Sequence, residues 1–253
     1  MNDIRWGLVS DIHFPRHDAR KVELFLKAMK WWQPHAIDLL GDIDDADSTS
    51  RWVEGTPRSM DLVDEGVKGT REFMAELNEL CPKAEDLHFH DGNHGWYRHK
   101  KYLEKNAAPF LGMINAEILY QPSNYGFEFH DYDDKPVRRF GNMFAHHGES
   151  ISKHSGESVR NDVQKELVSL VRGHSHRQGA YYSTHELAGL NLEGYEIGHL
   201  CDESKMKYEP TKNWQPGFAI AHVVNDTPFV QLIQIKETDE GLTCWIDGKK
   251  FVT

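Results

Sequence analysis

The chain has 253 residues, of which 39% are hydrophobic and 27% charged, and its formal net charge is −11. This length and composition predict one globular domain, residues 1–253, with a sizeable core. The acidic balance argues against tight nonspecific binding to nucleic acid, which depends on basic side chains that displace phosphate counterions. No apolar run reaches the roughly 20 residues that span a bilayer, so no membrane partner is expected. Scattered cysteines and the lack of a signal-peptide pattern predict reduced thiols and a cytoplasmic location.

The first half of the chain is predicted to alternate strands and helices. Short apolar runs predict strands at residues 4–10, 36–40 and 87–90, and helical spacing predicts helices at 18–32, about 60–80 and 96–111. Asp18 is expected to be the N-cap of the first helix. Further along, residues 127–132 and 137–145 are expected to form paired strands, followed by a helix at 158–167 and a strand at 168–171. Strand candidates at 217–224, 229–237 and 242–246 indicate added antiparallel strands.

Polar side chains follow five of the predicted strands. In open α/β sheets, function gathers at these carboxyl ends. The segments are SDIH with Asp11 and His13, LLGDIDD with Asp42 and Asp45, DGNHG with Asn93 and His94, FAHHG with His146 and His147, and VRGHSHRQG with His174 and His176. Each segment alone has an ordinary alternative, such as a turn capped by Asp. Five such segments in order, each after an apolar run, are hard to assign to chance.

These residue types point to a metal site. Carboxylate, imidazole and amide oxygen ligands suit divalent Zn, Mn, Fe and Ni, and the scattered cysteines argue against a thiolate zinc site. In an extended segment, residues i and i+2 face the same side. Asp11 with His13, and His174 with His176, are therefore expected to face one cavity, with Gly173 bending the chain before the second pair.

The ordered set of motifs resembles the calcineurin-like metallophosphoesterase superfamily and covers residues 11–176. The segments HHGESISKHSG, GHSHRQGAYY and NWQPGF resemble the bacteriophage and prophage branch of that superfamily. The resemblance implies the α/β (α+β) fold class, as a four-layer α-β-β-α sandwich with two mixed β-sheets. It also implies two divalent metal ions as cofactors, with manganese expected first and zinc, iron or nickel as alternatives.

The resemblance also implies roles for individual residues. One metal would be held by Asp11, His13, Asp42 and His176, and the other by Asp42, Asn93, His147 and His174, so that Asp42 bridges the two. His147 is preferred to His146 because it directly precedes a glycine. His94 would lie near the leaving group, with Asp45 orienting its ring and favouring its protonated form. Gly95 departs from the usual pattern, in which Glu or Asp follows Gly-Asn-His, so one supporting interaction is missing or is supplied elsewhere.

The function that the resemblance implies is hydrolysis of phosphate esters by a hydroxide that bridges the two metals. A phosphodiesterase of the nucleotide or cyclic-nucleotide type is expected first, acting on a small phosphate ester or a nucleotide. A phosphomonoesterase, a DNA-end or RNA-end nuclease, and a metal-poor interaction scaffold are the alternatives. Arg177 and Arg98 are candidate contacts for a substrate phosphate, although the basic run that begins at Arg98 also suits a solvated helix face.

Overall fold

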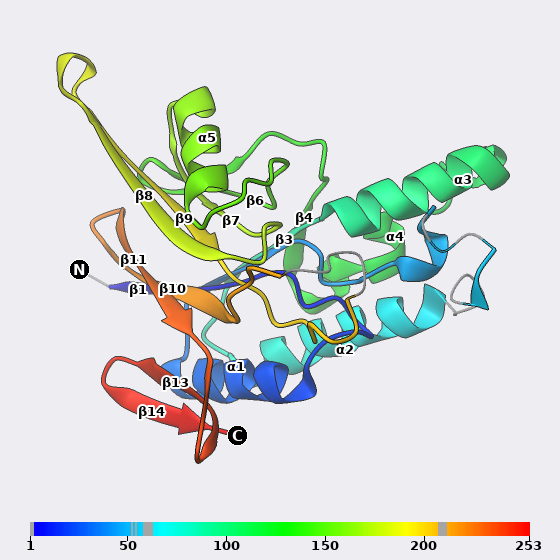
Figure 1. Ribbon diagram of the computed structural model, residues 1–253, viewed down its shortest axis with the longest axis horizontal. Helices are drawn as coiled ribbons and strands as arrows, with labels where there is room; N and C mark the ends of the chain where they lie inside the picture. Colours follow the sequence, from blue (N-terminus) through cyan, green and yellow to red (C-terminus); the bar gives the residue numbers. More distant parts are fainter. Residues whose placement is uncertain (1–2, 52, 54, 58–62, 207–211) are drawn as a thin grey trace.

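Two mixed β-sheets pack face to face, and helices cover their outer faces (Figure 1). The computed structural model describes residues 3–51, 53, 55–57, 63–206 and 212–253. Within these residues the larger sheet has the strand order β11-β10-β1-β2-β3-β4. Its strands are β1 (Ile4–Val9), β2 (Ala36–Leu40), β3 (Asp86–His90), β4 (Phe127–His130), β10 (Gly217–Val224) and β11 (Thr227–Gln234). Strands β1 to β4 run parallel, whereas β10 and β11 are antiparallel to their neighbours.

The second sheet has the strand order β5-β6-β7-β9-β8 and is also mixed. Its strands are β5 (Val137–Phe140), β6 (Met143–His146), β7 (Ser169–Arg172), β8 (Gln178–His185) and β9 (Leu190–Ile197). Strands β6, β7 and β9 are parallel, and β5 and β8 are antiparallel at the two edges. The helix α5 (Glu157–Glu166) covers the outer face of this sheet.

The larger sheet is covered on its outer face by α1 (Ala19–Trp32), α2 (Val63–Leu80) and α4 (Ala116–Tyr120). A π-helical turn at His94–His99 leads into α3 (Lys100–Asn106), which projects beyond the sheets in Figure 1. A small antiparallel sheet of β12 (Lys236–Thr238), β13 (Gly241–Ile246) and β14 (Lys249–Val252) packs on α1. None of the helices in the described ranges combines the length and the apolar character that crossing a bilayer requires.

The hydrophobic core explains why the layers form. Side chains alternate across a strand, so Ile37 and Leu39 of β2 face the helices while Ala36 and Leu40 face the second sheet. The same alternation divides the buried residues into one cluster under the helices of the larger sheet, one between the sheets and one under α5. The predicted α-β-β-α sandwich with two mixed sheets is therefore confirmed.

Two predicted features of the strands are wrong. Residues 127–132 and 137–145 were expected to pair, but β4 joins the larger sheet beside β3, and β5 and β6 pair with each other in the second sheet. The second run breaks because Gly141, with φ of 54°, turns the chain into a hairpin. The run at 229–237 divides between β11 and β12, which lie in different sheets. Local alternation identifies a strand but does not select its partner.

The helix predictions hold in part. Helix α1 begins as expected, with the Asp18 side chain accepting a hydrogen bond from the backbone N–H of Arg20 at 3.0 Å. The predicted helix at 96–111 is broken into the π-helical turn, α3 and a 3₁₀ turn at Ala108–Phe110. The predicted start of the second helix near residue 60 lies outside the described residues. Helix α4 has no counterpart among the predicted elements.

A buried ion pair joins the two sheets. Asp38 of β2 is fully buried and accepts hydrogen bonds from Arg139 Nε of β5 at 2.9 Å and from Trp6 Nε1 at 2.7 Å. His90 Nε2 lies 2.8 Å from its second oxygen. Burial alone would raise the pKa of Asp38, but Arg139 and His90 hold this pKa well below its ordinary value. The charged form of Asp38 is thus part of the folded state.

We predict that Asp38→Asn lowers the free energy of unfolding by about 3–5 kcal/mol, because it leaves a buried guanidinium without its full partner. The lowered pKa means that Asp38 contributes stability above its unfolded pKa of about 3.9 and loses it as the pH falls toward the folded value. The difference between the two proteins in urea denaturation should therefore shrink below about pH 4. Glu85→Gln, which changes an exposed carboxylate near the start of β3, is the control. If Asp38→Asn lowered the free energy of unfolding no more than Glu85→Gln does, the prediction would be wrong.

Candidate metal centre

The strand ends of both sheets meet at one place. Asp11 and His13 follow β1, Asp42 follows β2, Asn93 and His94 follow β3, His147 follows β6, and His174 and His176 follow β7. All of these side chains are buried except those of Asn93 and His174, which are half-buried. Ligands from both sheets therefore lie together although as many as 165 positions separate Asp11 from His176 along the chain.

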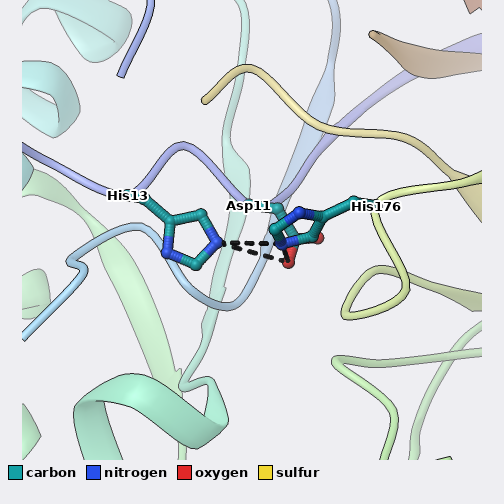
Figure 2. Close-up of side chains that lie close together, drawn as sticks. All are labelled: Asp11, His13 and His176. Atoms are coloured by element: carbon teal, nitrogen blue, oxygen red, sulfur yellow. Dashed lines mark hydrogen bonds and ion pairs between the residues drawn. The ribbon is translucent and has the colours of Figure 1, made fainter. Parts of the chain in front are cut away.

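Asp11, His13 and His176 form the first cluster (Figure 2). The Nε2 atoms of His13 and His176 lie 3.0 Å apart, and Oδ1 of Asp11 lies 3.1 Å from Nε2 of His176 and 3.7 Å from Nε2 of His13. Two adjacent ligand atoms at ~2.1 Å from one octahedral ion are about 3.0 Å apart. The three atoms are thus spaced as ligands of one ion.

The hydrogen bonding of Asp11 supports the same interpretation. Its Oδ2 accepts hydrogen bonds from the Ser10 hydroxyl at 2.6 Å and from the backbone N–H of His174 at 2.9 Å. Its Oδ1 is buried yet accepts no hydrogen bond from the described residues. Nδ1 of His176 is also buried and has no hydrogen-bond partner among these residues. A buried carboxylate oxygen without a donor is costly unless a cation lies beside it. Asp11 therefore fits a metal ligand.

Asp42, His147 and His174 form the second cluster. Nε2 of His147 lies 3.2 Å from Oδ2 of Asp42 and 3.1 Å from Oδ1 of Asn93. The other ring nitrogen, Nδ1, is 2.6 Å from the carbonyl oxygen of Leu40 and donates to it, which leaves Nε2 as the lone-pair atom facing the cluster. Burial alone would raise the pKa of Asp42, but His147 holds it far below its ordinary value.

The structure separates the two adjacent histidines. His147 is fully buried beside Asp42, whereas His146 stacks on Tyr132 with ring centroids 5.9 Å apart. Nδ1 of His146 accepts a hydrogen bond from the backbone N–H of Gly148 at 3.0 Å. His146 is the last residue of β6 and directly precedes His147, and the side chains of the two residues point to opposite sides of the chain.

At five of the candidate ligands the backbone is left-handed, not extended. The φ angles are 54° at Asp11, 60° at His13, 50° at Asp42, 69° at His174 and 57° at His176. The expectation that residues i and i+2 would face one side because their segment is extended is therefore wrong. Asp11 and His13 still lie in one cluster, whereas His174 and His176 lie in different clusters and line the same cavity. Such conformations cost about 1–3 kcal/mol each for residues other than glycine, and they gather at functional sites.

Two glycines of the motifs make room for the ligands. A Cβ atom at Gly92 would overlap the side chain and backbone of Asp42, and one at Gly173 would overlap Asp11 and the Ser10 hydroxyl. Gly173 was expected to bend the chain, but φ at this position is not in the left-handed region. Its role is the close approach of the β7 end to the β1 end.

Asp91 occupies the space beside Gly95. A Cβ atom at Gly95 would overlap Oδ1 of Asp91 and lie 2.9 Å from the Tyr120 hydroxyl. Asp91 is buried and accepts a hydrogen bond from the backbone N–H of Gly92 at 2.9 Å. Burial raises the pKa of Asp91 well above its ordinary value. Sequence reasoning missed this residue, although its place directly before Gly92 in DGNHG was visible.

His94 lies at the edge of the second cluster. Its Nδ1 is 2.9 Å from the carbonyl oxygen and 3.2 Å from Oδ1 of Asp45, and Arg98 donates to its Nε2 at 3.1 Å. These contacts assign the proton to Nδ1 in a neutral ring. Burial and Arg98 lower the pKa of His94. Asp45 was expected to favour the protonated form, but it does not outweigh these two effects, and its Oδ1 is also 3.1 Å from Nδ1 of His13.

A cavity of about 470 Å³ opens above the two clusters and is lined by Asp42, Asn93, His94, Arg98, Ile151, His174 and His176. The two arginines that sequence analysis singled out differ here. Arg98 faces the cavity, whereas Arg177 is buried and donates to the carbonyl oxygen of Ser175 at 3.2 Å. Among the described residues, Arg177 is not part of the cavity lining.

Comparison with known proteins gives distant likenesses. No protein-family model matches the chain. The gene 54 protein of Mycobacterium phage L5 is 24% identical over 226 residues, covering 85% of this chain and 88% of the relative. The gene 54 protein of Mycobacterium phage D29 is 24% identical over 238 residues, covering 90% and 92%. These relatives agree with the predicted resemblance to a phage-type branch.

Solved structures with a similar chain path include Vps29 proteins and phosphoesterases. Vps29 from Cryptosporidium parvum has a TM-score of 0.49 at 12% identity, covering 99% of this chain and 95% of that chain. Wild-type Vps29 from Entamoeba histolytica, complexed with Zn²⁺, has a TM-score of 0.48 at 12% identity, covering 96% and 97%. Yfce, a phosphoesterase from E. coli, has a TM-score of 0.44 at 15% identity, covering 91% and 93%. With TM-scores this low, the fold assignment rests on the chain's own strand order.

We predict that His147→Ala weakens binding of at least one Mn²⁺ by more than about 10-fold, whereas His146→Ala changes it less than about twofold, because only His147 directs a ring nitrogen to Asp42. Isothermal titration of the metal-stripped protein with Mn²⁺ measures both. Circular dichroism confirms that each variant is folded. If His146→Ala weakened Mn²⁺ binding more than His147→Ala does, His146 would be the ligand.

Proposed function

We propose that this chain is a dinuclear metal-dependent phosphoesterase that hydrolyses phosphodiesters of the nucleotide type. The observation that carries the proposal is the pair of buried Asp-His clusters below one cavity, with Asp11 Oδ1 buried and without a hydrogen-bond donor in the described residues. We also propose a cytoplasmic location, which the buried free thiols of Cys81, Cys201 and Cys244 support.

The two clusters provide the ligands for two ions. One ion would be held by Asp11, His13 and His176, the other by Asn93, His147 and His174, and Asp42 would serve both. Two divalent ions supply Lewis acidity toward a phosphoryl oxygen and a nucleophilic water at neutral pH. Manganese suits this mixture of carboxylate, amide and imidazole ligands, and zinc, iron or nickel are the alternatives to be tested.

The protein's own groups then position the ester and move one proton. Arg98 carries its guanidinium at the edge of the cavity, where it can bind a phosphate oxygen. In the structure this guanidinium donates a hydrogen bond to Nε2 of His94 at 3.1 Å. When a substrate phosphate takes up Arg98, Nε2 would no longer accept the hydrogen bond from Arg98 and could bind a proton and donate it to the departing oxygen, while Asp45 keeps Nδ1 in place.

The first test is metal-dependent hydrolysis of bis(p-nitrophenyl) phosphate. We expect turnover with Mn²⁺, loss of turnover on chelation, and a drop of at least about 100-fold in Asp42→Asn, because one carboxylate serves both ions. Asp133→Asn, which changes an exposed carboxylate, is the control. If monoesters, diesters and cyclic esters all resist the wild-type protein with Mn²⁺, Zn²⁺ and Ni²⁺, the catalytic proposal is wrong and the scaffold alternative is favoured.

The second test concerns His94. We predict that His94→Ala retains its metals but loses about 10²–10⁴-fold in kcat on a nucleoside or alkyl diester, since a basic leaving oxygen needs a proton. The loss should be far smaller on a nitrophenyl ester, whose leaving group departs without one. His185→Ala, an exposed histidine on β8, should match the wild type on both esters. Equal losses on both esters would show that His94 positions the substrate and is not the acid.

A further inference from the structure

A second and larger cavity adjoins the metal centre. Its volume is about 870 Å³, and Asn93 and Arg98 line both it and the cavity above the metal ligands. The two spaces therefore adjoin at Asn93 and Arg98. Pockets of roughly 300–1,000 Å³ accommodate whole organic ligands, so the smaller cavity alone could hold a small ester or a mononucleotide. The larger cavity, called the groove below, has room for a further part of the substrate.

The groove concentrates positive charge in an acidic protein. Among the described residues, the charged side chains that line it are those of Arg51, Arg98, Lys101, Lys105 and Glu104. Arg98 also lies 3.6 Å from a carboxylate oxygen of Asp45 and 3.6 Å from one of Asp47. Lys101 and Glu104 are paired at 2.8 Å on the exposed surface, where such pairs are weak and readily exchanged for a ligand. The chain as a whole carries a formal charge of −11. An anionic ligand is thus favoured in the groove and disfavoured over most of the remaining surface.

The groove also presents aromatic faces among these cations. Tyr97 and Tyr102 line it and are 41% and 46% exposed. Tyr97, Lys101 and Lys105 follow one another at intervals of four residues, which places them on one side of the π-helical turn and α3. Lys100 lies off this face and is not part of the groove lining, and its Nζ lies 3.5 Å from Oδ2 of Asp133.

We propose that the groove binds a second nucleotide of a single-stranded substrate whose neighbouring phosphodiester lies over the metals. The tyrosines would stack on an unpaired base, and Lys101 and Lys105 would contact the phosphate that follows it. Alternating stacking platforms and cations are the usual recognition of single strands. A base in a duplex is already stacked and paired, so duplex DNA cannot use the tyrosines. This inference rests on the proposed phosphodiesterase function and specifies its substrate as linked, unpaired nucleotides.

Binding is tested apart from turnover, with a fluorescein-labelled hexathymidylate and fluorescence anisotropy in Ca²⁺ instead of Mn²⁺. Tyr102→Leu should weaken binding about 10-fold, and Tyr102→Phe should keep it within about twofold, because only the aromatic face is needed. Lys101→Ala/Lys105→Ala should weaken binding and reduce the slope of log K against log salt by about 0.7, the value for the one phosphate that these two lysines would contact. Lys100→Ala is the matched control on the same helix.

Turnover then links the groove to the metal centre. In Mn²⁺, the groove variants should lose at least about 10-fold in kcat/KM on dithymidine phosphate relative to bis(p-nitrophenyl) phosphate, while Lys100→Ala keeps the wild-type ratio. Groove variants that match Lys100→Ala in both assays would overturn the inference, as would equal affinity for a hexamer duplex. If the wild type binds the single strand through the groove but cleaves no ester, the proposed function fails and the binding site stands.

Discussion

The packing of the two large sheets against each other is the constraint on which the candidate metal centre depends. Asp11 and Asp42 follow strands of the larger sheet, whereas His147 and His176 follow strands of the second. A small rotation of one sheet would separate ligand atoms that now lie about 3 Å apart. The apolar layer between the sheets and the buried Asp38–Arg139 pair therefore do more than stabilise the fold. They hold two halves of one site in register.

The site has energetic costs that the rest of the fold must offset. Left-handed backbone at Asp11, His13 and other ligands is unfavourable by itself, and so is a buried carboxylate oxygen without a donor. Both features make sense beside cations that are held in fixed positions. The glycines at 92 and 173 allow this arrangement because any side chain there would displace a ligand. The left-handed backbone and the glycines at 92 and 173 thus both serve to bring the candidate ligands close together.

Charge is divided between neighbouring regions. The candidate metal centre gathers carboxylates and imidazoles in a buried space, whereas the adjoining groove gathers arginine, lysine and tyrosine at the surface. Arg98 lies at the boundary and contacts both Asp45 and His94. Cationic side chains thus gather at one place in a protein whose net charge is −11.

The sequence by itself determined where polar side chains follow the strands and which residue types are the candidate ligands, because both are encoded within a few residues of a glycine or an apolar run. It also determined the start of α1, since the Asp18 cap is a local contact. Only the tertiary structure decided that β4 pairs with β3, that Asp91 fills the space beside Gly95, and that Lys101 faces a groove while Lys100 does not. These outcomes depend on contacts between distant segments, and local periodicity carries no information about which segments will meet.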